Sequence, residues 1–211
     1  MQYSSKSGLS IDIVTPPKKC SICHHAIAPK YIDFVQTNSH GYDFAFQCTN
    51  CHQIFIAKYE YNNGHPYRLS YIYPKVPQKI DFEKEIEEIS PLFSETYNQS
   101  LYAESNSLHQ LTGIGLRKSL EYLIKDFLIA ENPEKEESIK KSTLAQCIEN
   151  FIDDTNLKEV SKRATWLGND ETHYVKKWED KDINDLKILV KLTVNWIHNI
   201  LLTKKYISEM Q

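Results

Sequence analysis

Four of the five cysteines form two Cys-x-x-Cys pairs, Cys20/Cys23 and Cys48/Cys51, with 24 residues between the pairs. Two such pairs can supply four thiolates to one tetrahedral Zn²⁺, because the tight turn within each pair directs both sulfur atoms the same way. A set of four protein thiolates leaves no open coordination position, so the predicted zinc ion is structural. An alternative ligand set, in which an imidazole replaces one thiolate, also fits the sequence. Three histidines lie beside the pairs: His24, His25 and His52.

Other kinds of cysteine chemistry fit the sequence less well. A redox Cys-x-x-Cys motif usually opens a helix in a thioredoxin-like βαβ unit, whereas these pairs lie among β-type segments. The fifth cysteine, Cys147, lies at helical spacing from Leu144 and Phe151 and is predicted to be a core thiol. The first residues, Met-Gln-Tyr-Ser-Ser-Lys, lack the apolar stretch of a signal peptide. Paired thiols without an export signal are typical of a reducing compartment, so a cytoplasmic protein is expected.

The segments that must position the thiols have the pattern of β-strands. In residues 42–47 and 67–73, large apolar side chains recur at every second position, and further strands are expected at 31–36 and 54–61. Asn62-Asn63-Gly64 predicts a hairpin turn. Two strands and a turn between the cysteine pairs are the arrangement of a zinc ribbon. Because this region has few aliphatic side chains, metal binding is expected to supply much of its folding free energy.

Helical periodicity replaces this pattern after Pro74 and Pro77. Helices are expected to start at Asp81 or Ser90-Pro91 and to cover 107–130, 144–151, 157–167 and a long stretch from 183, with a charged loop at 131–138. The sequence therefore predicts an α+β protein. A small zinc-ribbon β module occupies residues 1–78, and an all-α helical bundle follows in residues 79–211.

Composition and charge limit the classes of function. Hydrophobic residues at 41% and charged residues at 25% are ordinary for a globular protein, and no apolar run reaches the length of a membrane span. Residues 1–80 carry eight Lys/Arg against four Asp/Glu, a net charge of +4, whereas residues 81–211 carry 17 against 24, a net charge of −7. A zinc ion with four thiolates would lower the first value by two. Such a distribution disfavours binding to a nucleic-acid backbone.

Two polar clusters in the helical region could do chemistry. Arg117 and Glu121 are four residues apart, so they form either an ion pair or part of a site. Asn169 and His173 are expected to approach them in space. A His beside an Asn and an Arg could perform general acid–base chemistry on RNA or position a phosphate. The competing interpretation, which we favour, is a hydrogen-bonded network that fixes helix packing.

Two glycines stand inside the first of these clusters. Gly113 and Gly115 each cost a helix about 1 kcal/mol relative to alanine. The close approach of another backbone is the expected reason for both.

A resemblance to a known family rests on four stretches: Ile89-Ser-Pro-Leu-Phe93, Tyr97-Asn-Gln-Ser-Leu-Tyr-Ala-Glu104, Gly115-Leu-Arg-Lys-Ser-Leu-Glu-Tyr-Leu-Ile-Lys-Asp126 and Gly168-Asn-Asp-Glu-Thr-His173. With them, the segment from about Ile86 to Ile200 resembles the domain-of-unknown-function family numbered 4145, a helical domain of bacterial proteins that a zinc ribbon often precedes. Some members are fused to restriction-type or helicase-type partners. The resemblance thus implies a role in phage defence or in nucleic-acid-linked processes.

The expected helical fold is also distantly similar to the higher-eukaryote-and-prokaryote nucleotide-binding (HEPN) domains. Many of these are metal-independent ribonucleases that act as dimers and use an Arg followed, after four to six residues, by a His. Here Arg163 stands ten positions before His173, with no Arg or Lys between them. A HEPN-like ribonuclease would therefore have to use His173 with Arg117 and Asn169, while Glu121 completes the set of candidate catalytic residues.

Together these patterns favour a non-enzymatic binding or interaction module over an enzyme. We expect a homodimer formed through apolar helix faces, with a protein partner or, less strongly, a nucleic acid as ligand. The predicted contacts are exposed aromatic side chains of the ribbon: Tyr59, Tyr61, Tyr71 and Tyr73. The alternative is the HEPN-like ribonuclease.

Overall fold

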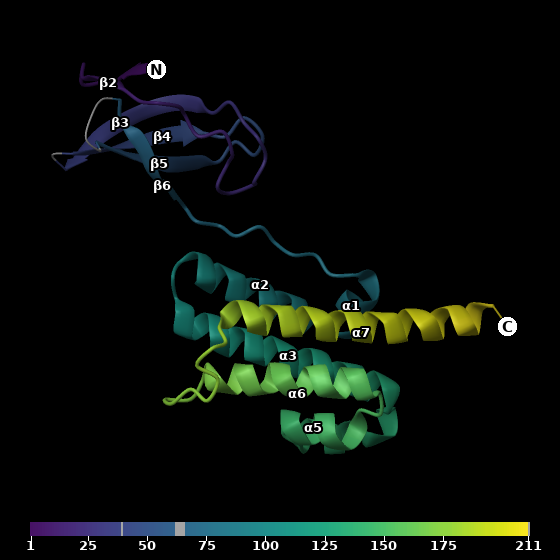
Figure 1. Ribbon diagram of the computed structural model, residues 1–211. Coiled ribbons are helices and arrows are strands. Elements are labelled where there is room, and N and C mark those ends of the chain that lie inside the picture. The colour runs from purple at the N-terminus through teal and green to yellow at the C-terminus, as the bar shows by residue number, and fades with distance from the viewer. Residues whose placement is uncertain (39, 62–65, 211) are drawn as a thin grey trace. The chain divides into compact units, whose positions relative to one another are not determined.

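The structure, a computed structural model, describes residues 1–38, 40–61 and 66–210 (Figure 1). The chain divides into two units, Met1–Gln78 and Lys79–Gln211. The first contains antiparallel sheets and the second contains helices, so the predicted α+β class is confirmed. The hairpin turn expected at Asn62-Asn63-Gly64 lies outside the described residues.

Two antiparallel sheets form the first unit, which we call the β unit. The smaller sheet pairs β1 (Gln2–Ser4) with β2 (Ser10–Asp12), and neither strand was expected from the sequence. The larger sheet contains, in chain order, the four expected strands: β3 (Lys30–Asn38), β4 (Gly41–Gln47), β5 (Ile54–Glu60) and β6 (Arg68–Tyr73). Each strand pairs with the next one along the chain, so the larger sheet is a meander.

The core of the β unit is built from aromatic rings on one face of the larger sheet. Phe44 stacks on Phe34 with ring centroids 4.7 Å apart and meets Tyr59 edge-on at 5.0 Å. The expectation that Tyr59 is exposed is therefore wrong: its side chain is 0% exposed, and its hydroxyl donates to the Thr15 carbonyl at 2.8 Å. Strand alternation explains this, because Tyr59 shares the inward face of β5 with Phe55.

The other three tyrosines keep part of their surface in solvent. Tyr61 and Tyr73 are 38% and 54% exposed, and Tyr71 is half-buried. The Tyr71 and Tyr73 rings contact each other with centroids 4.6 Å apart. Three of the four expected aromatic contacts thus remain available on the β unit.

The second unit, which we call the helical unit, is all-α. Its elements are α1 (Lys84–Ile89), α2 (Pro91–Ser105), α3 (His109–Glu131), the 3₁₀ turn η1 (Pro133–Lys135), α4 (Glu136–Lys141), α5 (Leu144–Phe151), α6 (Thr155–Asp170) and α7 (Ile183–Glu209). The segment 131–138 was expected to be a loop, but it contains η1 and the start of α4. Pro133 suits a first turn, and α4 has acidic residues in its first turn and basic ones in its last, which complements the helix dipole.

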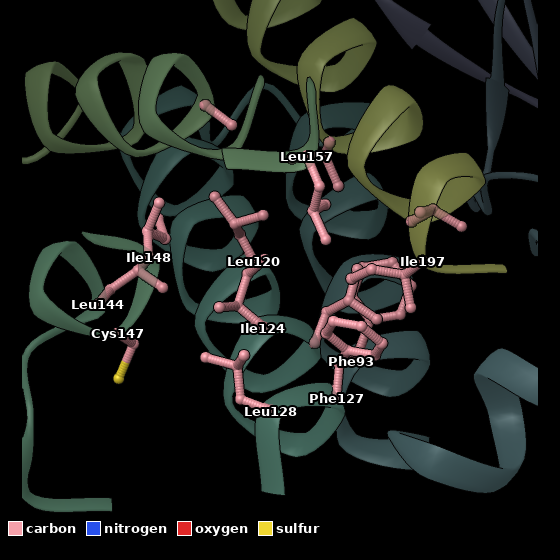
Figure 2. Close-up of a cluster of buried hydrophobic side chains, with 14 of the residues drawn as sticks. Phe93, Leu120, Ile124, Phe127, Leu128, Leu144, Cys147, Ile148, Leu157 and Ile197 are labelled. Atoms are coloured by element: carbon pink, nitrogen blue, oxygen red, sulfur yellow. The ribbon is translucent and has the colours of Figure 1, made fainter. Parts of the chain in front are cut away.

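Helix α3 lies at the centre of the helical unit and contacts every other α-helix of it. Its apolar side chains lie between those of α5 on one side and those of α2 and α7 on the other, as Figure 2 shows for Leu120, Ile124 and Leu128. Cys147 is fully buried among them, so its prediction as a core thiol is confirmed. Within the described residues, no helix combines the length and the apolar character needed to cross a membrane.

The two glycines of α3 make close contacts. A Cβ added to Gly115 would lie 2.2 Å from Ser100 Oγ and 3.6 Å from Ser100 Cα, so α2 approaches α3 at this point as expected. A Cβ added to Gly113 would lie 2.4 Å from Cβ of Glu171, which follows α6. The neighbour of Gly113 is therefore a side chain rather than a second backbone.

Candidate functional site

The first cysteine pair lies in a tight turn between β2 and β3. The backbone N–H groups of Ile22 and Cys23 donate to Cys20 Sγ at 3.4 and 3.5 Å. The turn is closed on the backbone, because the His24 amide donates to the Cys20 carbonyl at 3.1 Å and the Cys20 amide donates to the His25 carbonyl at 3.0 Å. Amide donors directed at sulfur stabilise a thiolate.

The second cysteine pair repeats this geometry between β4 and β5. The N–H groups of Asn50 and Cys51 donate to Cys48 Sγ at 3.3 and 3.4 Å. The His52 amide donates to the Cys48 carbonyl at 3.1 Å, and the Cys48 amide donates to the Gln53 carbonyl at 2.9 Å. The two turns thus present their thiols in the same way.

The turns bring all four sulfur atoms together. Sγ of Cys20 lies 3.9 Å from Sγ of Cys51, and Sγ of Cys23 lies 3.7 Å from Sγ of Cys48. The four sulfur atoms all lie within 4.8 Å of one another. Ligand atoms at about 2.3 Å from a tetrahedral metal ion are about 3.8 Å apart, whereas a disulfide needs about 2.05 Å. The spacing fits a shared metal ion, and the thiols form no disulfide.

Histidine takes no part in this donor group. Within the described residues the group comprises the four cysteines alone. Nδ1 of His25 lies 2.9 Å from the Cys23 carbonyl oxygen, and His24 and His52 serve as turn residues with a left-handed φ of 60°. The variant site with an imidazole ligand is therefore not the arrangement found.

The thiols of the group have diverging pKa values. The amide of His25 lowers the pKa of Cys23 to about 5, and the side-chain amide of Asn50, 3.6 Å from Cys23 Sγ, acts in the same direction. The Gln53 amide also favours the thiolate of Cys51, but desolvation and the neighbouring thiols outweigh it and raise the pKa of Cys51 to about 12. Four adjacent sulfurs cannot all ionise alone, whereas a divalent cation would stabilise four thiolates.

The donor chemistry limits which ions this centre could hold. Ca²⁺ and Mg²⁺ require oxygen ligands, whereas a tetrahedral set of sulfur ligands suits soft or borderline transition metals. Cys20 and Cys48 are buried and the other two cysteines are half-buried. An ion held by all four thiolates would have no open coordination position for a substrate.

In the helical unit, the structure brings three of the four candidate catalytic residues together. Arg117 Nε donates to Asn169 Oδ1 at 2.7 Å, and Arg117 Nη1 lies 3.6 Å from Glu121 Oε2. Glu121 also lies within 3.4 Å of Lys118 Nζ and 3.2 Å of Lys125 Nζ. Desolvation opposes the charge of this carboxylate, but the lysines outweigh it and lower its pKa. These contacts join α3 to the end of α6.

His173 lies apart from those contacts. Its backbone N–H donates to the Asn169 carbonyl at 3.0 Å, but its imidazole is exposed and makes no hydrogen bond or ion pair with Arg117 or with any other described residue. His173 lines a pocket of about 430 Å³ at the end of α6 together with Trp166, Asn169, Asp170, Lys177 and Trp178.

The sequence did not lead us to this pocket, although it contains a usable signal. Trp166 and Trp178 are twelve residues apart on either side of Gly168-Asn169, and their rings stack at 6.1 Å. Apolar periodicity does not connect a helical residue with a residue of the following loop. Two tryptophans on either side of a helix end are the sequence signal that could have indicated this pocket.

Comparisons with known proteins contribute no assignment. No family model matches this chain, and neither a curated protein nor a solved structure matches it. The resemblance to the 4145 family rests on the four stretches quoted above, and the similarity to HEPN domains rests on the expected helical fold. Function must therefore be inferred from the geometry of the chain itself.

Proposed function

We propose that the chain is a non-enzymatic binding module whose N-terminal unit is a zinc ribbon. One structural Zn²⁺ is held by Cys20, Cys23, Cys48 and Cys51. The observation that carries this proposal is the sulfur spacing of 3.7 and 3.9 Å between the two cysteine pairs. Zinc is the expected ion, because closed tetrathiolate sites in small β modules bind it structurally.

The contacts of the helical unit favour binding over catalysis. A ribonuclease would need Arg117 and Asn169 free to hold a phosphate, yet these two side chains bind each other. The charge of Arg117 is also shared with Glu121, which three cationic side chains surround. Such contacts are those of a network that fixes α6 against α3.

The HEPN-like ribonuclease remains the second candidate on one observation. His173 is exposed in a pocket that also contains Asn169, so an imidazole could meet a ligand there. In this mechanism His173 would act as acid and base, with Arg117 and Asn169 at the phosphate. Loss of RNA cleavage in His173→Ala, with the fold retained, is the result that would favour the enzyme.

Further parts of the proposal follow from the motifs and from exposed apolar surface. Residues 79–211 are proposed to be a domain of the 4145 type that works in the cytoplasm of a bacterium, in phage defence or another nucleic-acid-linked process. A homodimer would cover apolar side chains exposed on α3, on α7 and directly after α7: Leu111, Ile114, Tyr206, Ile207 and Met210. Light scattering coupled to size-exclusion chromatography gives the mass in solution, and a monomeric mass would remove the dimer.

Metal analysis tests the central claim. The purified chain should contain one zinc per chain, and Co²⁺ in its place should give the visible absorption of a tetrahedral thiolate site. Cys48→Ser should lose the metal, whereas the matched control Cys147→Ser, which changes a core thiol of the helical unit, should keep it. A β unit that is folded without metal, or a chain that retains zinc after Cys48→Ser, would contradict the zinc ribbon.

A further inference from the structure

Two tryptophans at the end of α6 form an exposed aromatic pair. The rings of Trp166 and Trp178 are nearly parallel, at an angle of 11°, with centroids 6.1 Å apart. At the contact distance of about 3.5 Å, rings with this centroid separation overlap only in part. The side chains are accordingly 44% and 36% exposed. Flat apolar surface on both indoles remains open to the pocket.

The pair is held in place by a buried carboxylate. Asp170, which is 9% exposed, accepts hydrogen bonds at its Oδ2 from the backbone amides of Lys177 and Trp178, at 2.9 and 2.7 Å. These bonds fold the loop after α6 back over the helix. Lys176 further ties the loop to Glu171, with 2.5 Å between Nζ and Oε1. The pocket is thus preformed, because the loop is held by specific contacts.

The polar groups that line the pocket are mostly donors. Arg117 Nε can only donate, so it binds the oxygen of the Asn169 amide. The Nδ2 group of Asn169 is then not used in this contact. Within the described residues, neither this NH₂ group nor the indole N–H of Trp166 or Trp178 has a hydrogen-bond partner, and Lys177 forms no ion pair. The one carboxylate of the lining, Asp170, already accepts two amides. A matching ligand offers ring surface and acceptors but few donors.

We infer that this pocket binds a proline-rich segment of a partner protein. Proline rings pack flat against indole faces, and a polyproline II helix has unpaired carbonyl groups and no N–H at its prolines. Those carbonyls would accept from Asn169 Nδ2, from the indole N–H groups and from Lys177. The pocket volume of about 430 Å³ lies within the range of ligand sites. This inference rests on the proposed binding role and names its ligand.

Other occupants fit the surroundings less well. A nucleotide also has a flat ring and acceptors, but residues 81–211 carry a net charge of −7, which repels a phosphate backbone. A methylated ammonium group would meet cations that already lie 5.9 Å from each indole centroid: the Arg163 guanidinium over Trp166 and Lys177 Nζ over Trp178. An uncharged peptide has neither disadvantage.

Tryptophan fluorescence of the full-length, zinc-loaded chain tests the inference. The probe is a blocked decaproline peptide, and a blocked Gly-Ser decapeptide is the control ligand with carbonyls but no rings. Decaproline should change the fluorescence saturably, over a constant background from Trp196, whereas the Gly-Ser peptide should not. Trp178→Ala should weaken decaproline binding roughly tenfold or more, because truncation of a central tryptophan removes a main contact.

Matched variants distinguish the pocket from general surface effects. Tyr102→Ala removes a 50% exposed ring from α2 and should leave binding unchanged. Asp170→Ala keeps both indoles but frees the loop, so it should weaken binding although the ring surface is still present. Circular dichroism of each variant shows whether the helices are intact.

Several results would overturn the inference: no saturable response at millimolar decaproline, equal binding of the Gly-Ser peptide, unchanged binding in Trp178→Ala, or tighter binding of a twelve-residue oligothymidylate. These results leave the proposed function standing if the chain retains one zinc and cleaves no RNA. Conversely, decaproline binding together with RNA cleavage that depends on His173 would keep the pocket and refute the non-enzymatic role.

Discussion

The two units of this chain are stabilised by different interactions. In the core of the β unit most buried residues are aromatic, among them Phe44, Phe46 and Tyr59, and two are the cysteines Cys20 and Cys48. In the helical unit, leucines and isoleucines of α3 are enclosed by side chains from several other helices. We therefore expect the stability of the first unit to depend on its thiol cluster and a bound ion, and that of the second to depend mainly on buried apolar area.

This contrast shows where each unit is vulnerable. The four clustered thiols have diverging pKa values, and one shared cation would stabilise all four as thiolates, so we expect the β unit to depend on a metal ion. The described part of the helical unit has no such thiol cluster, and the buried hydroxyl of Ser90 has a partner within it, Asp126, to which it donates. Perturbations that destroy one unit should leave the other folded.

Removal of the metal is the strongest way to test the contrast. Chelation should unfold residues 15–75, because metal binding in small structural sites contributes on the order of 10 kcal/mol. Hydrogen exchange monitored by mass spectrometry should then show lost protection in β3 to β6 and unchanged protection in α3. Joint unfolding of both units, or a β unit that stays protected without metal, would refute the comparison.

A cavity in the helical core is the converse test. Leu120 is 0% exposed at the centre of α3, and Leu120→Ala should destabilise the helical unit by about 2–5 kcal/mol. Leu192→Ala, at a site that is 42% exposed on α7, is the matched control and should have a small effect. Urea unfolding measures both values. The zinc content should stay at one per chain, and a loss of zinc in Leu120→Ala would show that the units are coupled.

Relief of backbone strain should strengthen the β unit modestly. His24 has a φ of 60°, which costs a residue with a side chain about 1 kcal/mol relative to glycine, and its buried Nε2 has no hydrogen-bond partner within the described residues. His24→Gly should therefore stabilise the metal-bound unit by about that amount. Competition with a chelator during thermal unfolding provides the measurement. His25→Gly, where φ is not positive, is the control and should bring no gain.

The smallest expected effect concerns a carboxylate of the helical unit. Desolvation raises the folded-state pKa of Asp126 above 3.8, and the hydroxyl of Ser90, which donates to it at 2.5 Å, offsets this only in part. The folded state therefore loses stability as pH rises from the unfolded value through the raised one. Asp126→Asn should raise the melting temperature of the helical unit at pH 7, and this gain should fade below about pH 3.8. A gain that is independent of pH would contradict the assignment.

Sequence patterns anticipated the elements of both units better than the contacts between them. The cysteine spacing and the period-two strands are local signals, so the cluster of four thiols and β3 to β6 could be predicted. The side on which a strand residue lies depends on what covers the sheet. Tyr59 was therefore misplaced, because the cover comes from Ile13 and Thr15, more than 40 residues earlier.

The candidate site of the helical unit shows the same limit. Arg117 and Asn169 are 52 residues apart, and quoted motifs suggested their approach, but the exposed position of His173 depends on how the loop after α6 folds. Asp170 determines how this loop folds, because it accepts hydrogen bonds from two backbone amides of the loop. Such bonds to the backbone cannot be read from residue types or their spacing. The two tryptophans on either side of the end of α6 could have drawn attention to this place, but their stacking depends on that loop and could not be predicted.

Each cysteine of the first pair contacts a cysteine of the second, Cys20 with Cys51 and Cys23 with Cys48, and this affects the order of folding. Each Cys-x-x-Cys turn closes through hydrogen bonds between near neighbours and can form early, whereas the sulfurs of Cys20 and Cys51 come from residues 31 positions apart. A cation bound first by one pair would close the loop between the pairs when the other two thiols joined it, at a modest entropic cost. The folding rate of the β unit should thus rise with free zinc concentration, while the helical unit folds at its own rate.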